Sequence, residues 1–159
     1  MVVRLAREID DTYVGQDIVV VGVLKGSFVF LADLIRQMKS PISGVEFVRA
    51  SSYGSATTSS GTPELSLGIP DGALLGKHVL LVEDIVDTGF TTSAVLQHLK
   101  MQRAASVHLC ALLDKPDRRR VVVTPDFVGI EIPDVFVVGY GLDFGERYRE
   151  LPSIYTLEK

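Results

Sequence analysis

Tryptophan is absent from this sequence, and cysteine occurs only once. A single cysteine excludes an internal disulfide framework, and Cys110 lies in the apolar run 107–113, where we expect a buried, unpaired thiol. Such cysteine usage fits a reducing compartment. Long hydrophobic runs are also missing, because Lys25 and Asp33 break the longest ones well short of a membrane span, and no charged leader precedes a signal-like apolar core. The sequence therefore predicts a soluble, cytoplasmic protein.

Basic residues are not in excess either. The 16 lysines and arginines are outnumbered by 20 aspartates and glutamates, which gives a net charge of −4 and a pI near 5.3. A general nucleic-acid-binding surface needs the opposite balance, so none is expected. An anionic ligand would instead be met by a few local cations, for which Lys25, Lys115 and Arg149 are candidates, or by a metal ion.

The residues that are present suit one globular domain with a substantial core, since 47% of the 159 residues are hydrophobic. Apolar runs typical of buried strands alternate with apolar residues at helical spacing. Alternating strands and helices imply an α/β fold, with a mainly parallel twisted sheet flanked by helices. The expected elements are a helix around Leu5 and Ile9, a strand over 18–24, a helix capped by Ser27 and ended by Pro41, strands over 45–50 and 79–82, a helix over 91–101, a strand over 106–113, and short strands over 127–132 and 135–138.

Residues 51–63 are mostly Ser, Thr, Gly and Ala. This composition buries too little apolar surface to offset the entropy lost on ordering, so we predict a mobile lid over about 51–66. A lid of this kind would close over a bound ligand and exclude water.

The most informative stretch is 79–92, which reads Val-Leu-Leu-Val-Glu-Asp-Ile-Val-Asp-Thr-Gly-Phe-Thr-Thr. Its first four residues are typical of a strand covered on both faces, and Glu83 and Asp84 follow at the carboxyl end, the edge at which α/β sheets bind ligands. Residues 87–89 form a turn with a glycine, and residues 91–93 are N-cap types at the start of a helix. Exposed N–H groups at such a helix start can hold a phosphate.

Residues 79–92 resemble, almost residue for residue, the phosphoribosyl-pyrophosphate signature of the type I phosphoribosyltransferases, in the form of their 6-oxopurine (hypoxanthine-guanine) branch. Three further segments occur in the order that this family shows: Gly-Val-Leu-Lys-Gly-Ser at 22–27, Leu-Leu-Asp-Lys-Pro at 112–116, and Ile-Pro-Asp-Val-Phe-Val-Val-Gly-Tyr-Gly-Leu-Asp at 132–143. The resemblance extends from about Arg4 to Ile154. It implies the type I phosphoribosyltransferase fold as a single domain over 1–159, with a core over about 4–124 and a small hood over about 125–159 that also has an N-terminal contribution.

The resemblance implies an enzyme of purine salvage, a glycosyltransferase of the pentosyltransferase class. Its reaction would move the 5-phosphoribosyl group of phosphoribosyl pyrophosphate to N9 of hypoxanthine, guanine or both, giving IMP or GMP and pyrophosphate. The resemblance also implies Mg²⁺ as cofactor and a homodimer or homotetramer, without a nucleic-acid or membrane partner. Preference among hypoxanthine, guanine and xanthine stays open.

The family's site roles carry over to matching positions of this sequence. Asp87 would be the general acid/base near N7 of the purine. Lys115 would donate to O6 and so reject adenine, whose 6-amino group offers no acceptor, and Phe136 would stack on the ring. A non-proline cis peptide is implied between Leu24 and Lys25. The full set of implied contacts is Asp87, Thr88, Gly89, Phe90 and Thr91 for the 5′-phosphate; Glu83 and Asp84 for the ribose; Leu24, Lys25, Gly26 and Arg149 for the pyrophosphate; Lys115, Phe136, Val137 and Asp143 for the purine; Glu83, Asp84 and Asp143 for the metal; and Ser52 and Tyr53 for the lid.

Ordinary structural interpretations exist beside these roles. Without the resemblance, the acids at 83–84 read as a solvated strand end, Asp87 as a turn residue, and Lys25 and Lys115 as surface lysines. The arginines at 118–120 predict a solvated turn. The three histidines have no metal-ligand spacing and are expected to be structural.

Two rival functions compete with this hypothesis. One is a regulator of the same fold that binds RNA or nucleotides, against which the acidic balance and the set Lys115, Phe136 and Asp143 argue. The other takes Asp-Thr-Gly at 87–89 as an aspartic-protease motif, which needs β surroundings and a second paired aspartate. Here Phe90 and a helical pattern follow instead.

Overall fold

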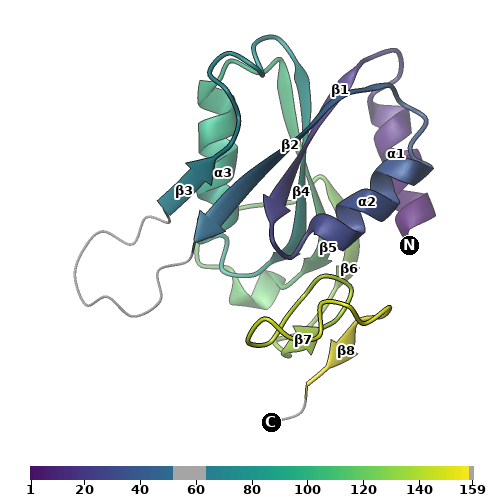
Figure 1. The fold of residues 1–159 in the computed structure, drawn as a ribbon, viewed down its shortest axis with the longest axis vertical. Coiled ribbons are helices and arrows are strands. Elements are labelled where there is room, and N and C mark those ends of the chain that lie inside the picture. The colour runs from purple at the N-terminus through teal and green to yellow at the C-terminus, as the bar shows by residue number, and fades with distance from the viewer. Residues whose placement is uncertain (52–63, 158–159) are drawn as a thin grey trace.

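A six-stranded sheet forms the centre of the computed structural model, which describes residues 1–51 and 64–157 (Figure 1). Its strands are β1 (Ile18–Leu24), β2 (Ile42–Ser51), β3 (Glu64–Leu67), β4 (His78–Val86), β5 (Ser106–Asp114) and β6 (Phe127–Glu131). The strand order is β3-β2-β1-β4-β5-β6, and every neighbouring pair is parallel except β2 and β3. The expected α/β fold with a mainly parallel sheet is confirmed.

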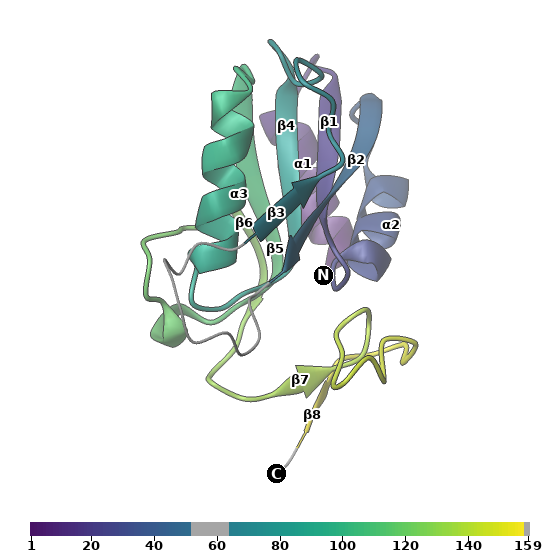
Figure 2. The same cartoon turned by 60° about the vertical axis from the view of Figure 1, so that its left-hand side comes forward.

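Helices cover both faces of the sheet. α1 (Val2–Thr12) and α2 (Phe28–Gln37) lie on one face, and α3 (Phe90–Met101) lies on the other (Figure 2). Successive residues of a strand point to opposite faces, so the apolar residues of β4 divide between two cores. Leu80 and Val82 pack with α1 and α2, whereas Val79 and Leu81 pack with α3.

Two expected element ends differ from the structure. Ser27 precedes α2, but its hydroxyl does not cap the helix, because it donates back to the Val23 carbonyl of β1 at 2.7 Å. The strand expected over 79–82 extends over 78–86, because β5 offers pairing partners as far as Asp114. Glu83 and Asp84 therefore lie within β4 and not beyond its end.

The hood consists of residues that follow β6. β7 (Val137–Val138) and β8 (Tyr155–Thr156) form a separate antiparallel pair below the main sheet (Figures 1 and 2). β6 begins just after the predicted division near residue 125 and pairs with β5 as an edge strand of the main sheet, because Phe127 packs into the core. α1 also packs on the core, where Arg4 donates to the carbonyls of Val128 and Gly129 at 2.8 Å.

Tyr140 and Gly141 fasten the hood to the core. The Tyr140 hydroxyl donates to Asp33 of α2. Burial is the main cause that raises the pKa of the Tyr140 phenol, and this hydrogen bond raises it further. Gly141 has φ +99° and packs so closely that a Cβ there would lie 2.3 Å from the Gly26 carbonyl. The hood is thus held against the turn that follows β1.

Cys110 is buried and unpaired, as predicted, and burial raises the pKa of its thiol. All three histidines make structural hydrogen bonds: His108 Nδ1 with the Tyr13 hydroxyl at 2.8 Å, His78 Nδ1 with Ser106 Oγ at 2.9 Å, and His98 Nε2 with Gln102 Nε2 at 2.9 Å. Within residues 1–51 and 64–157, no helix is long and apolar enough to cross a membrane.

Candidate active site

Two adjoining cavities lie at the carboxyl ends of β1 and β4, next to the hood. The first, of about 770 Å³, is lined by the β1–α2 turn, the β4–α3 turn and the hood residues Asp143, Glu146 and Arg149. The second, of about 880 Å³, is lined by Lys115, Arg118 and residues 134–137. Of the predicted site residues that the structure describes, all line one cavity or the other except Phe90, whose side chain is exposed. The residues that line both cavities are Asp84, Ile85, Asp87 and Asp143.

Glu83 and Asp84 both line the first cavity from within β4. Glu83 is only 3% exposed, and Thr92 Oγ1 donates to its Oε1 at 3.1 Å. Burial and the neighbouring Asp84 raise the pKa of Glu83 well above its usual value. Burial also raises the pKa of Asp84 to about 6, although backbone N–H groups and Arg149 oppose this shift. Two such adjacent carboxyl groups would be stabilised by a cation or by hydroxyl donors.

The β4–α3 turn presents backbone donors to the first cavity. Gly89 is the N-cap of α3 at φ +89°, and the first helical bond runs from Ser93 N to the Gly89 carbonyl at 2.9 Å. The N–H groups of residues 90–92 therefore have no partner within the helix. The capping expected from residues 91–93 is wrong, because the chain enters the helix at Gly89, where a Cβ would come 2.8 Å from the Val121 carbonyl.

The β1–α2 turn closes the first cavity from the opposite side. Its Leu24–Lys25 peptide is cis, as the resemblance implies. Gly26 packs against Asp84 so closely that a Cβ there would lie 1.6 Å from Asp84 Oδ2. Lys25 Nζ pairs with Glu146 Oε2 of the hood at 2.8 Å. Both a cation and a close backbone approach are therefore available where pyrophosphate is expected.

Arg149 reaches the same cavity from the hood. Its guanidinium donates to the Gly141 carbonyl at 2.8 Å and pairs with Asp143 Oδ1 at 2.8 Å. The other oxygen of Asp143 accepts the Glu146 backbone N–H at 2.9 Å. These contacts hold a cation and a carboxylate beside the boundary between the two cavities.

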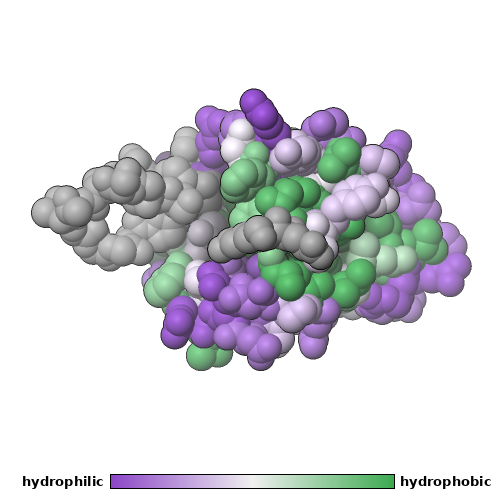
Figure 3. All heavy atoms as spheres, turned by 90° about the horizontal axis from the view of Figure 1, so that it is seen from below, coloured by the Kyte–Doolittle hydropathy of each residue, from purple (hydrophilic) through white to green (hydrophobic). Residues whose placement is uncertain are grey.

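The second cavity combines a buried cation with an aromatic wall. Lys115 follows β5, is 7% exposed, and has its Nζ 3.9 Å from Asp134 Oδ1. Phe136 is 44% exposed and packs edge to face with Phe144, with ring centroids 5.6 Å apart. Val137 is buried in β7. Figure 3, seen from below, shows hydrophobic residues gathered at the hood end of the molecule. A flat ring with a polar edge fits such a cavity.

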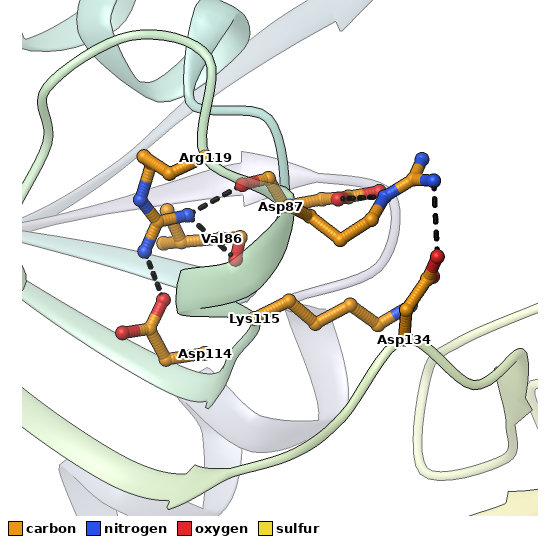
Figure 4. A network of polar contacts seen from close by, with 7 residues as sticks. Val86, Asp87, Asp114, Lys115, Arg119 and Asp134 are labelled. Carbon is orange, nitrogen blue, oxygen red and sulfur yellow. Dashed lines mark hydrogen bonds and ion pairs between the residues drawn. The ribbon is translucent and has the colours of Figure 1, made fainter.

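Asp87 lies where the cavities meet and is held by an arginine that the sequence pattern did not single out. Arg118 Nε donates to Asp87 Oδ1 at 2.9 Å, and Arg118 Nη1 donates to Asp134 Oδ2 at 3.3 Å. Arg119 donates to the Val86 carbonyl at 2.9 Å and to the Asp87 carbonyl, and pairs with Asp114 (Figure 4). The solvated turn predicted at 118–120 is confirmed for Arg118 and Arg120, whose side chains are exposed, and is wrong for Arg119, whose side chain is largely buried by these contacts.

The physical reason is a short 3₁₀ helix, Pro116–Arg118, which turns the chain back toward the β4–α3 turn. Asp134 and Glu146 were also missed as partners of Arg118 and Lys25. Adjacent arginines after a strand predict exposure, and no local pattern indicates which distant carboxylates they meet.

Ser52 and Tyr53, expected at the start of the lid, lie outside the described residues, as does most of the segment 51–66. Ser51 and Glu64 are the described residues on either side of 52–63, and they pair with each other between β2 and β3. The closing loop stays a prediction.

A metal ion would need ligands from outside the protein as well. In the part of the chain that the structure describes, no group of three or more His, Cys, Asp or Glu side chains could hold one by itself. Glu83, Asp84 and Asp143 supply carboxylate oxygens, the donor type that Mg²⁺ prefers, and this ion commonly takes its other ligands from water and substrate phosphates. The donor set therefore fits an Mg²⁺ ion that binds together with a phosphorylated ligand.

Comparison with known proteins gives one consistent result. Residues 1–145 match the family model "Phosphoribosyl transferase domain". The chain is 49% identical over 138 residues to hypoxanthine phosphoribosyltransferase from Haemophilus influenzae, covering 87% of the chain and 76% of that relative. It is 48% identical over 156 residues to hypoxanthine-guanine phosphoribosyltransferase from Aquifex aeolicus, covering 98% and 86%. A crystal structure of a hypoxanthine-guanine phosphoribosyltransferase from Bacillus anthracis, with HEPES in its active site, matches with a TM-score of 0.91 at 45% identity, covering 99% and 91%.

Proposed function

The chain belongs to the phosphoribosyl transferase domain family, and we propose that it is a purine-salvage enzyme of the 6-oxopurine branch. It transfers the 5-phosphoribosyl group of phosphoribosyl pyrophosphate to N9 of hypoxanthine, guanine or both, and releases pyrophosphate. The observation that carries the proposal is the pair of adjoining cavities that share Asp84, Asp87 and Asp143. A sugar phosphate in one and a purine in the other would meet at these shared residues.

The first cavity would hold the phosphorylated sugar. The 5′-phosphate binds at residues 87–91, where the helix start offers free N–H groups. The pyrophosphate binds at Leu24, Lys25 and Gly26 and at Arg149, whose planar fork suits paired oxygens. The ribose hydroxyls then lie against Glu83 and Asp84. This orientation directs C1′ toward the second cavity.

The second cavity would hold the base. Phe136 stacks on the purine, the backbone of Val137 and the Asp143 side chain meet its edge, and the buried Lys115 donates to O6. Adenine offers no acceptor at that position and leaves the lysine unpaired, which accounts for selection against it.

In the reaction the bond from C1′ to the pyrophosphate oxygen breaks and a bond from C1′ to N9 forms. The pyrophosphate leaves with the bonding electron pair, and the proton lost from the base is taken up or relayed by Asp87 near N7. Lys25 and Arg149 stabilise the charge that develops on the leaving group. Mg²⁺, held by Glu83 and Asp84 together with the substrate, would neutralise further phosphate charge. Asp143 would hold a metal ion only after exchanging its contact with Arg149.

A regulator of the same fold that binds RNA is not favoured. The net charge is −4, and the relatives compared above are enzymes by name. A cytoplasmic location and a dimer or tetramer remain predictions.

The test is a steady-state assay with phosphoribosyl pyrophosphate, Mg²⁺ and each of hypoxanthine, guanine, xanthine and adenine. Transfer to hypoxanthine or guanine and little transfer to adenine are expected. Asp87→Asn should bind substrates and fold normally but lower kcat by about 10²–10⁴-fold, as is typical for a lost general acid/base. Absence of transfer to every 6-oxopurine would refute the proposal.

A further inference from the structure

Arg118 spans the second cavity from the core to the hood. Its side chain contacts Asp87, at the turn after β4, and Asp134, in the segment that leads into β7. Nε of the guanidinium contacts Asp87 and Nη1 contacts Asp134, so one rigid, planar group fixes both carboxylates. Lys115 Nζ lies 3.9 Å from Asp134 Oδ1, the oxygen that Arg118 does not contact. Negative and positive side chains therefore alternate along the cavity in the order Asp87, Arg118, Asp134 and Lys115.

The contact leaves Asp87 oriented and still able to react. Arg118 occupies Oδ1, and no hydrogen bond of the described residues engages Oδ2. The hydrogen bond that Arg118 donates to Asp87, together with the charges of both carboxylates, raises the pKa of the guanidinium, so Arg118 stays protonated. A permanently charged donor on one oxygen restricts rotation of the carboxylate.

Stability alone does not account for this arrangement. The Arg118 side chain is 44% exposed, and its partners are 36% and 56% exposed. Ion pairs this accessible contribute little to folding. They can still matter greatly for a reacting group, because a shift of an ångström in its position can lower a rate by as much as about a hundredfold.

On these contacts, and resting on the function proposed above, we propose that Arg118 is a positioning residue. It holds Asp87 turned toward the base as the proton acceptor, while Asp134 anchors its guanidinium from the hood side of the cavity. Its role is exerted on Asp87 and not on phosphoribosyl pyrophosphate, since Arg118 lines the second cavity and is not part of the first.

The test is a double-mutant cycle between Arg118→Gln and Asp87→Asn, with kcat and both KM values measured for hypoxanthine and guanine. In the otherwise unchanged enzyme, Arg118→Gln should lower kcat by about tenfold, a fraction of the effect of losing the acid/base itself, and leave KM for phosphoribosyl pyrophosphate within about twofold. In the Asp87→Asn enzyme, the same change should have no further effect on kcat. Arg118→Lys, which keeps the charge, should recover part of the lost kcat.

Arg120→Gln is the matched control, because its side chain is exposed two positions away and makes no hydrogen bond or ion pair within the described residues. It should leave kcat unchanged. An unchanged kcat in Arg118→Gln, or the same loss in both backgrounds, would overturn the positioning role while leaving the proposed function intact. A wild-type protein inactive on every 6-oxopurine would instead refute the function itself, and the positioning role with it.

Discussion

Replacing Gly26 with alanine should displace a functional carboxylate without removing it. A Cβ at this position would lie 1.6 Å from Asp84 Oδ2 and 2.4 Å from Asp84 Cγ, whereas real contacts begin near 3.0 Å. The Asp84 side chain must therefore retreat by more than an ångström. Since a misplacement of this size can cost about 10²-fold in rate, we expect kcat/KM for phosphoribosyl pyrophosphate to fall by about that factor.

The fold should survive this change, because Asp84 has a cavity to move into and overpacking of this kind costs about 1–3 kcal/mol. Far-UV circular dichroism and denaturant unfolding check the fold, and steady-state kinetics check the rate. Gly44→Ala is the matched control: a Cβ there meets its nearest neighbour, Val19, at an ordinary 3.7 Å. It should leave kcat/KM unchanged.

A second background separates the clash from any other effect of the methyl group. In an Asp84→Ala enzyme, the closest of the three contacts that remains is Asp84 Cβ at 3.2 Å, so the added methyl group nearly fits. Gly26→Ala should then cost little beyond the cost of Asp84→Ala. A wild-type kcat/KM for Gly26→Ala, or an equal loss in both backgrounds, would refute the reasoning.

The remaining predictions concern three other residues of the site. Lys115→Ala should raise KM for hypoxanthine and guanine by about tenfold or more while adenine remains a poor substrate, because a lost donor creates no partner for the 6-amino group; unchanged KM values would contradict this. Glu146→Gln should lower KM for phosphoribosyl pyrophosphate a few-fold, since it releases Lys25 from an exposed ion pair that contributes little to stability, and the exposed Glu150→Gln should not do so. Asp84→Asn should stabilise the ligand-free protein at high pH. The folded-state pKa of Asp84 is raised from 3.8 to about 6, so ionisation of Asp84 opposes folding. The contribution of the protonated carboxyl group to folding stability is fully present below about pH 4 and is lost as the pH rises through 6. Denaturant unfolding should show no gain near pH 3.5 and a gain of at most about 3 kcal/mol at pH 8, and an equal gain at both pH values would argue against a raised pKa.

Most strands of the central sheet could be predicted because their signal is local, but β3 (Glu64–Leu67) was not expected and begins inside the stretch that was predicted as a lid. The valine-rich run of β1 was expected over 18–24 and is found there, since a strand covered on both faces needs continuous apolar residues. The same holds for the β4–α3 turn, whose acids, glycine and helix start follow one another within a few residues of sequence.

The parts that could not be predicted depend on contacts between distant residues. Gly89 replaces the expected threonine and serine caps because of the nearby Val121 carbonyl, which belongs to a segment after β5. Arg118 meets Asp87 across 31 positions of sequence, and Lys25 meets Glu146 across 121. Periodicity and composition describe a residue's own element, and these pairings arise only when the elements pack.

The hood is paired separately from the main sheet. β7 and β8 form their own two-stranded sheet, and residues 134–137, which lead into β7, contribute a wall of the second cavity. Substitutions and small insertions in this part of the chain can accumulate without disturbing the pairing of β1, β4 and β5. Over evolutionary time, a lineage built on this plan can therefore change the base that it accepts while its chemistry at C1′ is inherited unaltered.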